Sequence, residues 1–199
     1  APHAQTLRNT PLTTRGNVSF FGCLGYELDL NHLLPVEEKE IKEQTALYKR
    51  HRKVFQFGTF RRSHNGWQVT DGKTTLAGVF HGCLSAVPRQ EYLRVTGLET
   101  GKTYRFSSRP QALRVGQFGD LVKHVVPVNL DPNGLVLRTA DKHITMADGI
   151  HQGTVSGGAL HSGIPMLPAF RGTGYSESQR NQLDFGSNLY IIEEEASHE

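Results

Sequence analysis

The stretch GYELDLNHLLPVEEKEIKEQTALYKR, residues 25–50, carries the clearest local pattern in the chain. Over residues 25–30 apolar and acidic side chains alternate, and a period of two is typical of a β-strand. Pro35 follows at a position that favours the start of a helix, and acidic residues fill the first turn, where the helix dipole stabilises them. We therefore predict a strand, a turn and an amphipathic helix from Val36 to about Lys53.

The predicted helix has an apolar face that needs a partner. Its inner positions follow the three-and-four spacing of an amphipathic helix. They are Ile41, Thr45, Tyr48, Arg52 and Phe55, with Ala46 and Leu47 widening the face. One strand and one helix cannot bury each other's apolar surface completely. The unit must therefore belong to a larger layer, and nothing else in the sequence resembles it.

The segment before this unit allows two interpretations. Thr13 or Thr14 can cap a short helix that runs to Phe21 and ends at Gly22. The β-branched and aromatic run that begins at Val18 is equally compatible with a buried strand. The sequence leaves both alternatives open.

After Phe57 the pattern changes to many short β segments. Asn65-Gly66 and Asp71-Gly72 are favoured hairpin turn pairs. Segments rich in β-branched and aromatic residues predict strands at 55–60, 67–70, 74–80, 92–95, 103–107, 135–139 and 189–192. Short strands separated by Gly and Pro predict an antiparallel β-sandwich or barrel.

These patterns divide the chain at about Gly58. We predict a first part, residues 1–57, that contains the β–α unit. The second part, residues 58–199, is predicted to be an antiparallel β-sandwich without a long helix. Residues 107–134 and 144–182 are rich in Gly and Pro, so they are expected to form long loops.

The composition is that of a globular protein. Its 199 residues carry a net charge of +3, and the basic residues are scattered, which argues against a nucleic-acid surface. No apolar run approaches the ~20 residues of a membrane span, and no signal peptide is recognisable. Cys23 and Cys83 form no disulfide framework. We therefore expect a cytoplasmic protein in a reducing compartment.

Two acidic residues are the first candidates for catalysis. Glu27 and Asp29 lie two positions apart on the predicted strand, so they share a face, as paired catalytic carboxylates can. The simpler interpretation is a polar strand end that leads into a loop, and we favour it.

The histidines raise the question of a metal site. His143, His151 and His161 are spaced by eight and ten positions, without the ligand motifs of zinc sites. Residues 131–134, Asp-Pro-Asn-Gly, resemble the start of a calcium loop but lack its alternating acidic ligands. We interpret them as a turn and predict no metal site.

Other motifs are incomplete. Residues 153–158 miss the spacing of a nucleophile elbow around Ser156, and residues 172–175 supply half of a dinucleotide fingerprint, so both are interpreted as loops. Four aromatic residues are candidates for a sugar-stacking platform or, more often, for a sandwich core. They are Trp67, Phe80, Tyr92 and Tyr104. We predict no catalytic residue, no cofactor-binding residue and no cofactor in this chain.

Several segments resemble the C-terminal part of glycoside hydrolase family 36 α-galactosidases. The resemblance is specific over residues 1–62, fairly specific over 158–192 and loose between them. The segments that carry it are 11–18 (PLTTRGNV), 21–30 (FGCLGYELDL), 37–44 (EEKEIKEQ), 49–60 (KRHRKVFQFGTF), 163–165 (GIP) and 184–190 (DFGSNLY).

This resemblance implies a fold and an activity. Such enzymes have a (β/α)8 barrel followed by an antiparallel β domain, so residues 1–57 are similar to the last β–α portion of the barrel. A whole barrel needs about 250 residues, so this part can supply little more than one unit. The resemblance implies a retaining hydrolase that releases terminal α-linked galactose from raffinose-type oligosaccharides, with two Asp about 5.5 Å apart.

The same resemblance implies that the chain is inactive alone. Both catalytic Asp of the family lie in barrel motifs upstream of this sequence, and none of the seven Asp here matches either motif. We expect an α-galactoside substrate for the whole enzyme, no nucleic-acid or membrane partner, and a homo-oligomer. A free-standing carbohydrate-binding or structural β-sandwich module is the alternative, and it has no use for part of a barrel wall.

Overall fold

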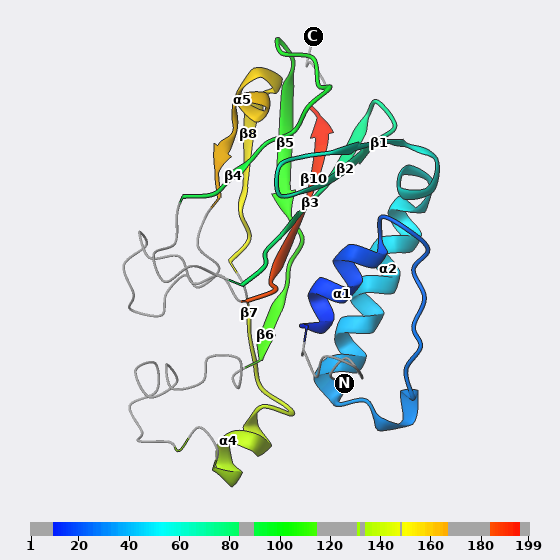
Figure 1. The fold of residues 1–199 in the computed structure, drawn as a ribbon, viewed down its shortest axis with the longest axis vertical. Helices are drawn as coiled ribbons and strands as arrows, with labels where there is room; N and C mark the ends of the chain where they lie inside the picture. The colour runs from blue at the N-terminus through cyan, green and yellow to red at the C-terminus, as the bar shows by residue number, and fades with distance from the viewer. Residues whose placement is uncertain are drawn as a thin grey trace.

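The computed structural model describes residues 10–83, 90–114, 131, 134–147, 149–166 and 184–195, and a six-stranded sheet forms its centre (Figure 1). The strands follow the order β1-β2-β3-β10-β5-β8 and pair antiparallel. Their bounds are β1 Thr59–Arg62, β2 Gly66–Thr70, β3 Thr74–Phe80, β5 Thr103–Ser108, β8 Gln152–Ser156 and β10 Ser187–Glu194. The described chain is thus mainly β, as predicted.

The last strand of the chain occupies the middle of the sheet. In β10, Tyr190 lies opposite Ala77 of β3 on one side and opposite Ser108 of β5 on the other. The strand therefore joins the β1-β2-β3 meander to the β5-β8 pair. Its alternation sends Leu189 to one face of the sheet and Tyr190 to the other, and both are fully buried.

Each face of the sheet has its own apolar core. One face is covered by a ribbon of β4 (Tyr92–Leu93) and β9 (Ile164–Pro165), together with helix α5 (Gly157–Ser162). Side chains on this face include Val79, Phe106, Leu160 and Ile192. The sandwich is therefore asymmetric, since a short ribbon and a helix replace a full second sheet.

The opposite face is covered by helices α1 (Leu12–Ser19) and α2 (Pro35–Phe57), which stand beside each other in Figure 1. The core between them and the sheet is lined by Phe20, Val54, Phe55, Val69, Leu76 and Leu189, with Leu47 and Tyr48 packed against it. We had expected this side of α2 to need a surface outside the β domain. The sheet of the same chain covers it instead.

The buried face of α2 differs from the predicted face by about one position. Glu40, Gln44 and His51 are buried, whereas Arg52 is exposed. The prediction was wrong here because it started the three-and-four spacing at Ile41, whereas the buried positions start one residue earlier, at Glu40. The helix also runs beyond the predicted end at Lys53.

The predicted strand at residues 25–30 is not a strand in the structure. From Leu24 to Asp29 the chain keeps the expected alternation of half-buried and exposed side chains, but no described strand pairs with it. Its end forms a short 3₁₀ helix, η1 (Leu30–His32). A strand assignment requires a hydrogen-bonded neighbour, and the described residues offer none.

Of the two alternatives for the residues before this segment, a helix or a strand, the structure shows the helix. Helix α1 ends at Ser19, and Phe20 caps it. Gly16 makes the contact between the two helices possible, because a Cβ at this position would overlap the side chain of Gln44 on α2. The small residue thus lets α1 lie directly on α2.

Three predictions in the second half of the chain were wrong. Residues 135–139 form helix α4 (Leu135–Ala140), not a strand. The expected loops contain β6 (Ala112–Arg114), β7 (Thr145–Ala147) and β8, and β8 belongs to the central sheet. Gly153 lowered the strand signal of β8, although its missing side chain makes room for the ring of Phe106.

Among the described residues, no helix is both long enough and apolar enough to cross a membrane.

Candidate functional site

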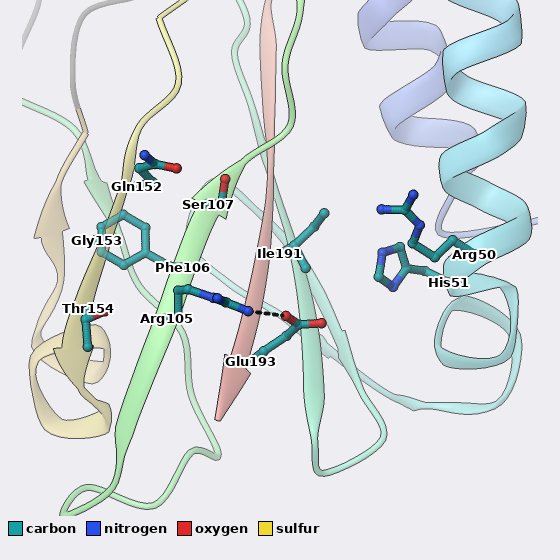
Figure 2. Close-up of a pocket in the computed structure, with 10 residues that line it drawn as sticks. All are labelled: Arg50, His51, Arg105, Phe106, Ser107, Gln152, Gly153, Thr154, Ile191 and Glu193. Carbon is teal, nitrogen blue, oxygen red and sulfur yellow. Dashed lines mark hydrogen bonds and ion pairs between the residues drawn. The ribbon is translucent and has the colours of Figure 1, made fainter. Parts of the chain in front are cut away.

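A polar hollow of about 660 Å³ lies beside α2, over strands β5, β8 and β10. We call it the sheet hollow. Strands β5, β8 and β10 form its floor, and α2 forms one wall (Figure 2). Its lining residues are Arg50, His51, Arg105, Phe106, Ser107, Gln152, Gly153, Thr154, Ile191 and Glu193. No helix of the described residues covers this face of β5 and β8, and its side chains are mostly polar.

One ion pair crosses the floor of the sheet hollow. Arg105 on β5 and Glu193 on β10 are opposite each other in the ladder, and their side chains lie 3.4 Å apart. Both are substantially exposed, so water screens the pair and it stabilises the fold only weakly. The arrangement leaves guanidinium and carboxylate groups available for a polar ligand.

His51 closes the wall of the sheet hollow. It is buried on the inner side of α2, and burial lowers the pKa of its imidazole, with a further decrease from the neighbouring Arg50. Glu193 and Asp71 act in the opposite direction but do not reverse the decrease in pKa. The imidazole is therefore neutral at neutral pH and can donate or accept a hydrogen bond.

The sheet hollow can bind but lacks an arrangement for catalysis. Hydroxyl, amide and guanidinium groups line it, which suits hydrogen bonds to the hydroxyls of a sugar. Glu193 is the only carboxylate among its lining residues, and none of them forms a nucleophile–base pair. Its lining comes from four segments, each about 40–55 positions from the next, so sequence patterns carried no signal for it.

The two carboxylates that the sequence offered for catalysis, Glu27 and Asp29, do not line the sheet hollow. Asp29 caps η1, accepting a hydrogen bond from the backbone of Asn31 at 3.0 Å and lying 2.6 Å from His32. The hydrogen bond from Asn31 is the largest cause of a lowered pKa at Asp29, and the hydrogen bond with His32 lowers this pKa further. Glu27 is exposed. Asp29 thus has a structural role in the described residues, although the segment that it ends is not a strand.

The histidines singled out by the sequence are not brought together as ligands. His143 and His161 are exposed, while His151 packs edge-on against Phe106 and lies 3.2 Å from the hydroxyl of Tyr190. Within the described residues, no group of three or more His, Cys, Asp or Glu could hold a metal ion. The prediction of no metal site stays a prediction, since other residues are not described.

The segment around Ser156 is regular structure rather than a loop. Ser156 ends β8 and caps α5, where its hydroxyl accepts a hydrogen bond from the backbone of Ala159 at 3.2 Å. The backbone of Ser156 is unstrained, unlike that of a nucleophile elbow. Residues 172–175 lie outside the described part of the chain.

The four candidate aromatics do not form one platform. Trp67 and Phe80 contact each other on the helix side of the sheet, at 4.9 Å between ring centres. Tyr104 is buried on the other face, and Tyr92 lies on the ribbon, under the guanidinium of Arg94. The core interpretation was therefore right for Tyr104, whereas Trp67 lies half-buried beside the core.

Comparisons with known proteins give the family context of this fold. The family model described as Melibiase matches residues 1–58. The α-galactosidase AgaA of Geobacillus stearothermophilus is 35% identical over 112 residues, which are 52% of this chain and 15% of that protein. The α-galactosidase Mel36A of Lactobacillus acidophilus is 34% identical over 113 residues, again 15% of its length. The match thus spans about 15% of the length of each of these curated relatives.

Solved structures extend the likeness over the whole fold. The α-galactosidase of Lactobacillus brevis superposes with a TM-score of 0.65 at 24% identity, covering 100% of this chain and 22% of that one. Family 36 AgaA gives the same TM-score and identity over 98% of this chain and 21% of its own, and variants of it were crystallised with stachyose and with raffinose. The chain therefore resembles family 36 α-galactosidases, in sequence over about half of its length and in fold over nearly all of it.

Proposed function

We propose that this chain is the C-terminal portion of an α-galactosidase that releases terminal α-linked galactose from raffinose-type oligosaccharides. The observation that carries the proposal is the combination of two matches. The Melibiase model covers residues 1–58, and a fold likeness to α-galactosidases continues through the β domain that follows. The raffinose-type substrate is supported by neighbours crystallised with raffinose and with stachyose, and hydrolysis with retention of configuration is what the resemblance to family 36 implies.

We further propose that residues 1–57 are part of a (β/α)8 barrel and residues 58–199 a C-terminal β domain. Helix α1, the extended segment at 24–29 and helix α2 follow one another as α–β–α, which is the repeating order of such a barrel. The unpaired peptide groups of the extended segment would then bond to neighbouring barrel strands.

A second hollow supports this barrel proposal. It has a volume of about 780 Å³ and lies between α1 and the extended segment, where Leu12, Val18, Leu24 and Leu28 line it. In an open-ended unit such apolar side chains meet water, and a neighbouring β–α unit would cover them. This is the position where the rest of a barrel would attach.

The isolated chain is proposed to be inactive, because the resemblance assigns both catalytic Asp to barrel motifs that this sequence does not contain. The role of the β domain is then to hold the last helix of the barrel against a rigid sheet. A homo-oligomer and a cytoplasmic location belong to the same proposal. Free, exposed Cys23 and Cys83 favour a reducing compartment.

The alternative of a free-standing carbohydrate-binding module rests on one observation, the sheet hollow with its polar lining. Titration of the chain with raffinose distinguishes the two proposals. A module binds the sugar through residues such as Arg105 and Gln152, so Gln152→Ala weakens binding. The C-terminal portion of a hydrolase shows no binding until the barrel is present.

The experiment for the main proposal is an activity comparison. The reading frame that encodes this chain is extended upstream, and the longer protein and the 199-residue chain are assayed on raffinose. We expect galactose release from the longer protein only. A longer protein that folds but leaves raffinose intact contradicts the proposed substrate, and turnover by the purified chain contradicts the proposed inactivity.

A further inference from the structure

Strand β8 is one outer strand of the central sheet, and no strand of the described residues pairs with its outer side. Ser108 donates its backbone N–H to His151 at 2.7 Å, and Gly157 donates to Lys102 at 2.9 Å. Peptide groups alternate sides along an antiparallel strand, so those of Gly153 and Val155 also face β5. Those of 152, 154 and 156 therefore point away from the sheet.

These three residues remain accessible. Gln152, Thr154 and Ser156 are exposed, and the structure shows no bond from their backbone groups to a described residue, apart from the C=O of Ser156, which as the N-cap is the first acceptor of α5. A row of free N–H and C=O groups is a template for one more strand. The edge of β8 is thus an unused hydrogen-bonding surface.

The two edges of the sheet differ in a way that matters for association. The other edge strand, β1, ends in Arg61 and Arg62, and charged residues on an edge prevent strand addition. Strand β8 has the sequence QGTVS, without charge or proline. Only the edge of β8 lacks these protecting features among the two outer strands.

We propose that β8 pairs antiparallel with β8 of a second copy of this chain, around a two-fold axis at Thr154. In this register Thr154 lies opposite Thr154 of the second copy, and Gln152 lies opposite Ser156. Thr154 then exchanges two hydrogen bonds with Thr154 of the second copy, and the N–H of each Ser156 donates to the C=O of the facing Gln152, giving about four hydrogen bonds, because the C=O of Ser156 is already the first acceptor of α5. Thr–Thr and Gln–Ser are neutral cross-strand pairs that can hydrogen-bond.

The charge distribution permits this contact. The charged residue nearest to the axis in this row is Arg105, which lies opposite Thr154 in the ladder. Two such arginines would be three strand spacings apart, about 14 Å. That exceeds the Debye length of about 8 Å at physiological salt, and each arginine is paired with Glu193 at 3.4 Å. Like-charge repulsion across the axis is therefore weak.

The contact also joins the two sheet hollows. Gln152 and Thr154 line the hollow and lie on the strand that the axis crosses. In the dimer the polar floors of both copies become one continuous surface on a single extended sheet. The inference gives an interface to the homo-oligomer proposed above, and it does not depend on the proposed hydrolysis.

The test compares two matched charge substitutions at the two edges. Thr154→Lys places two ammonium groups opposite each other at the axis, and Thr59→Lys adds the same charge to the exposed edge strand β1. Light scattering over a concentration series measures the mass of the wild-type chain and of both variants. We expect the wild type and Thr59→Lys to approach twice 22.1 kDa, and Thr154→Lys to weaken dimerisation at least about tenfold.

Hydrogen exchange supplies the second measurement on the same samples. The amides of residues 152–156 that face away from β5 should gain protection as the wild-type concentration rises, and they should not do so in Thr154→Lys. A wild type that stays at 22.1 kDa contradicts the proposal. So does a dimer that Thr154→Lys leaves intact, or one that Thr59→Lys abolishes as well. None of these results bears on galactose release, so the two proposals fail separately.

Discussion

The guanidinium of Arg109 lies 2.6 Å from the carboxylate of Glu40, with side-chain exposures of only 2% and 9%. The pair joins the end of β5 to helix α2, two segments 69 positions apart. Arg109 also donates to Asn17 on α1 at 2.9 Å, and Gln44 donates to Glu40 at 2.8 Å. One buried polar network therefore ties both helices to the sheet.

Glu40→Ala should lower the free energy of unfolding by about 3–5 kcal/mol, because it leaves the charge of Arg109 buried without a partner. Urea denaturation followed by circular dichroism measures the change. Glu43→Ala is the matched control on the same helix, since Glu43 is half-exposed and lies 4.0 Å from Lys39. A wild-type midpoint for Glu40→Ala would show that Arg109 reaches water in solution.

Gly78→Ala should disturb the aromatic cluster on the helix side of the sheet. A Cβ at Gly78 would lie 2.8 Å from ring atoms of both Phe21 and Phe80, so the rings must move. We expect a loss of about 1–3 kcal/mol. Gly25→Ala is the control, because nothing lies within 4 Å of its Cβ position. Equal thermal midpoints for the two variants would contradict the packing described here.

Trp67→Ala should cost less than the truncation of a fully buried aromatic residue. Phe20 is 0% exposed, so Phe20→Ala is expected to cost about 3–5 kcal/mol. Trp67 is half-buried and keeps one side toward water, so its truncation removes less buried surface. Chemical denaturation of both variants ranks them, and a larger effect for Trp67 would place that residue inside the core.

His51 should make stability depend on pH. Its folded pKa is lowered by burial, so its contribution is fully present above about pH 6.5, the ordinary pKa of His. The contribution is lost as the pH falls through the lowered folded pKa, since the unfolded state then binds more protons. The wild type should therefore lose more stability than His51→Gln between about pH 7 and pH 5. His161→Gln, at an exposed position, should follow the wild type.

The sequence was most informative where side-chain periodicity and turn chemistry act locally. The turn pairs Asn65-Gly66 and Asp71-Gly72 correctly predicted the hairpins around β2, and the predicted strand at 74–80 has the bounds of β3. Helix α2 was also predicted, because its acidic first turn and its periodic face depend on neighbouring residues only.

Non-local contacts account for what the sequence could not predict. Glu40 is buried with Arg109, which reaches it from the end of β5, and Gln44 donates to Glu40 in turn, so no local pattern announces the distant partner. The apolar run at residues 135–139 suited a strand, but it has no described ladder and forms helix α4. The sheet hollow combines residues of α2, β5, β8 and β10, so its lining could be recognised only in the fold.

The central claim is that this chain is the C-terminal portion of an α-galactosidase. The most direct measurement is the rate of galactose release from raffinose by the 199-residue chain and by the longest protein whose reading frame contains it. The account predicts release by the longer protein and none by the chain alone. A folded longer protein that releases no galactose, or release that co-purifies with the 22.1 kDa chain, would contradict it.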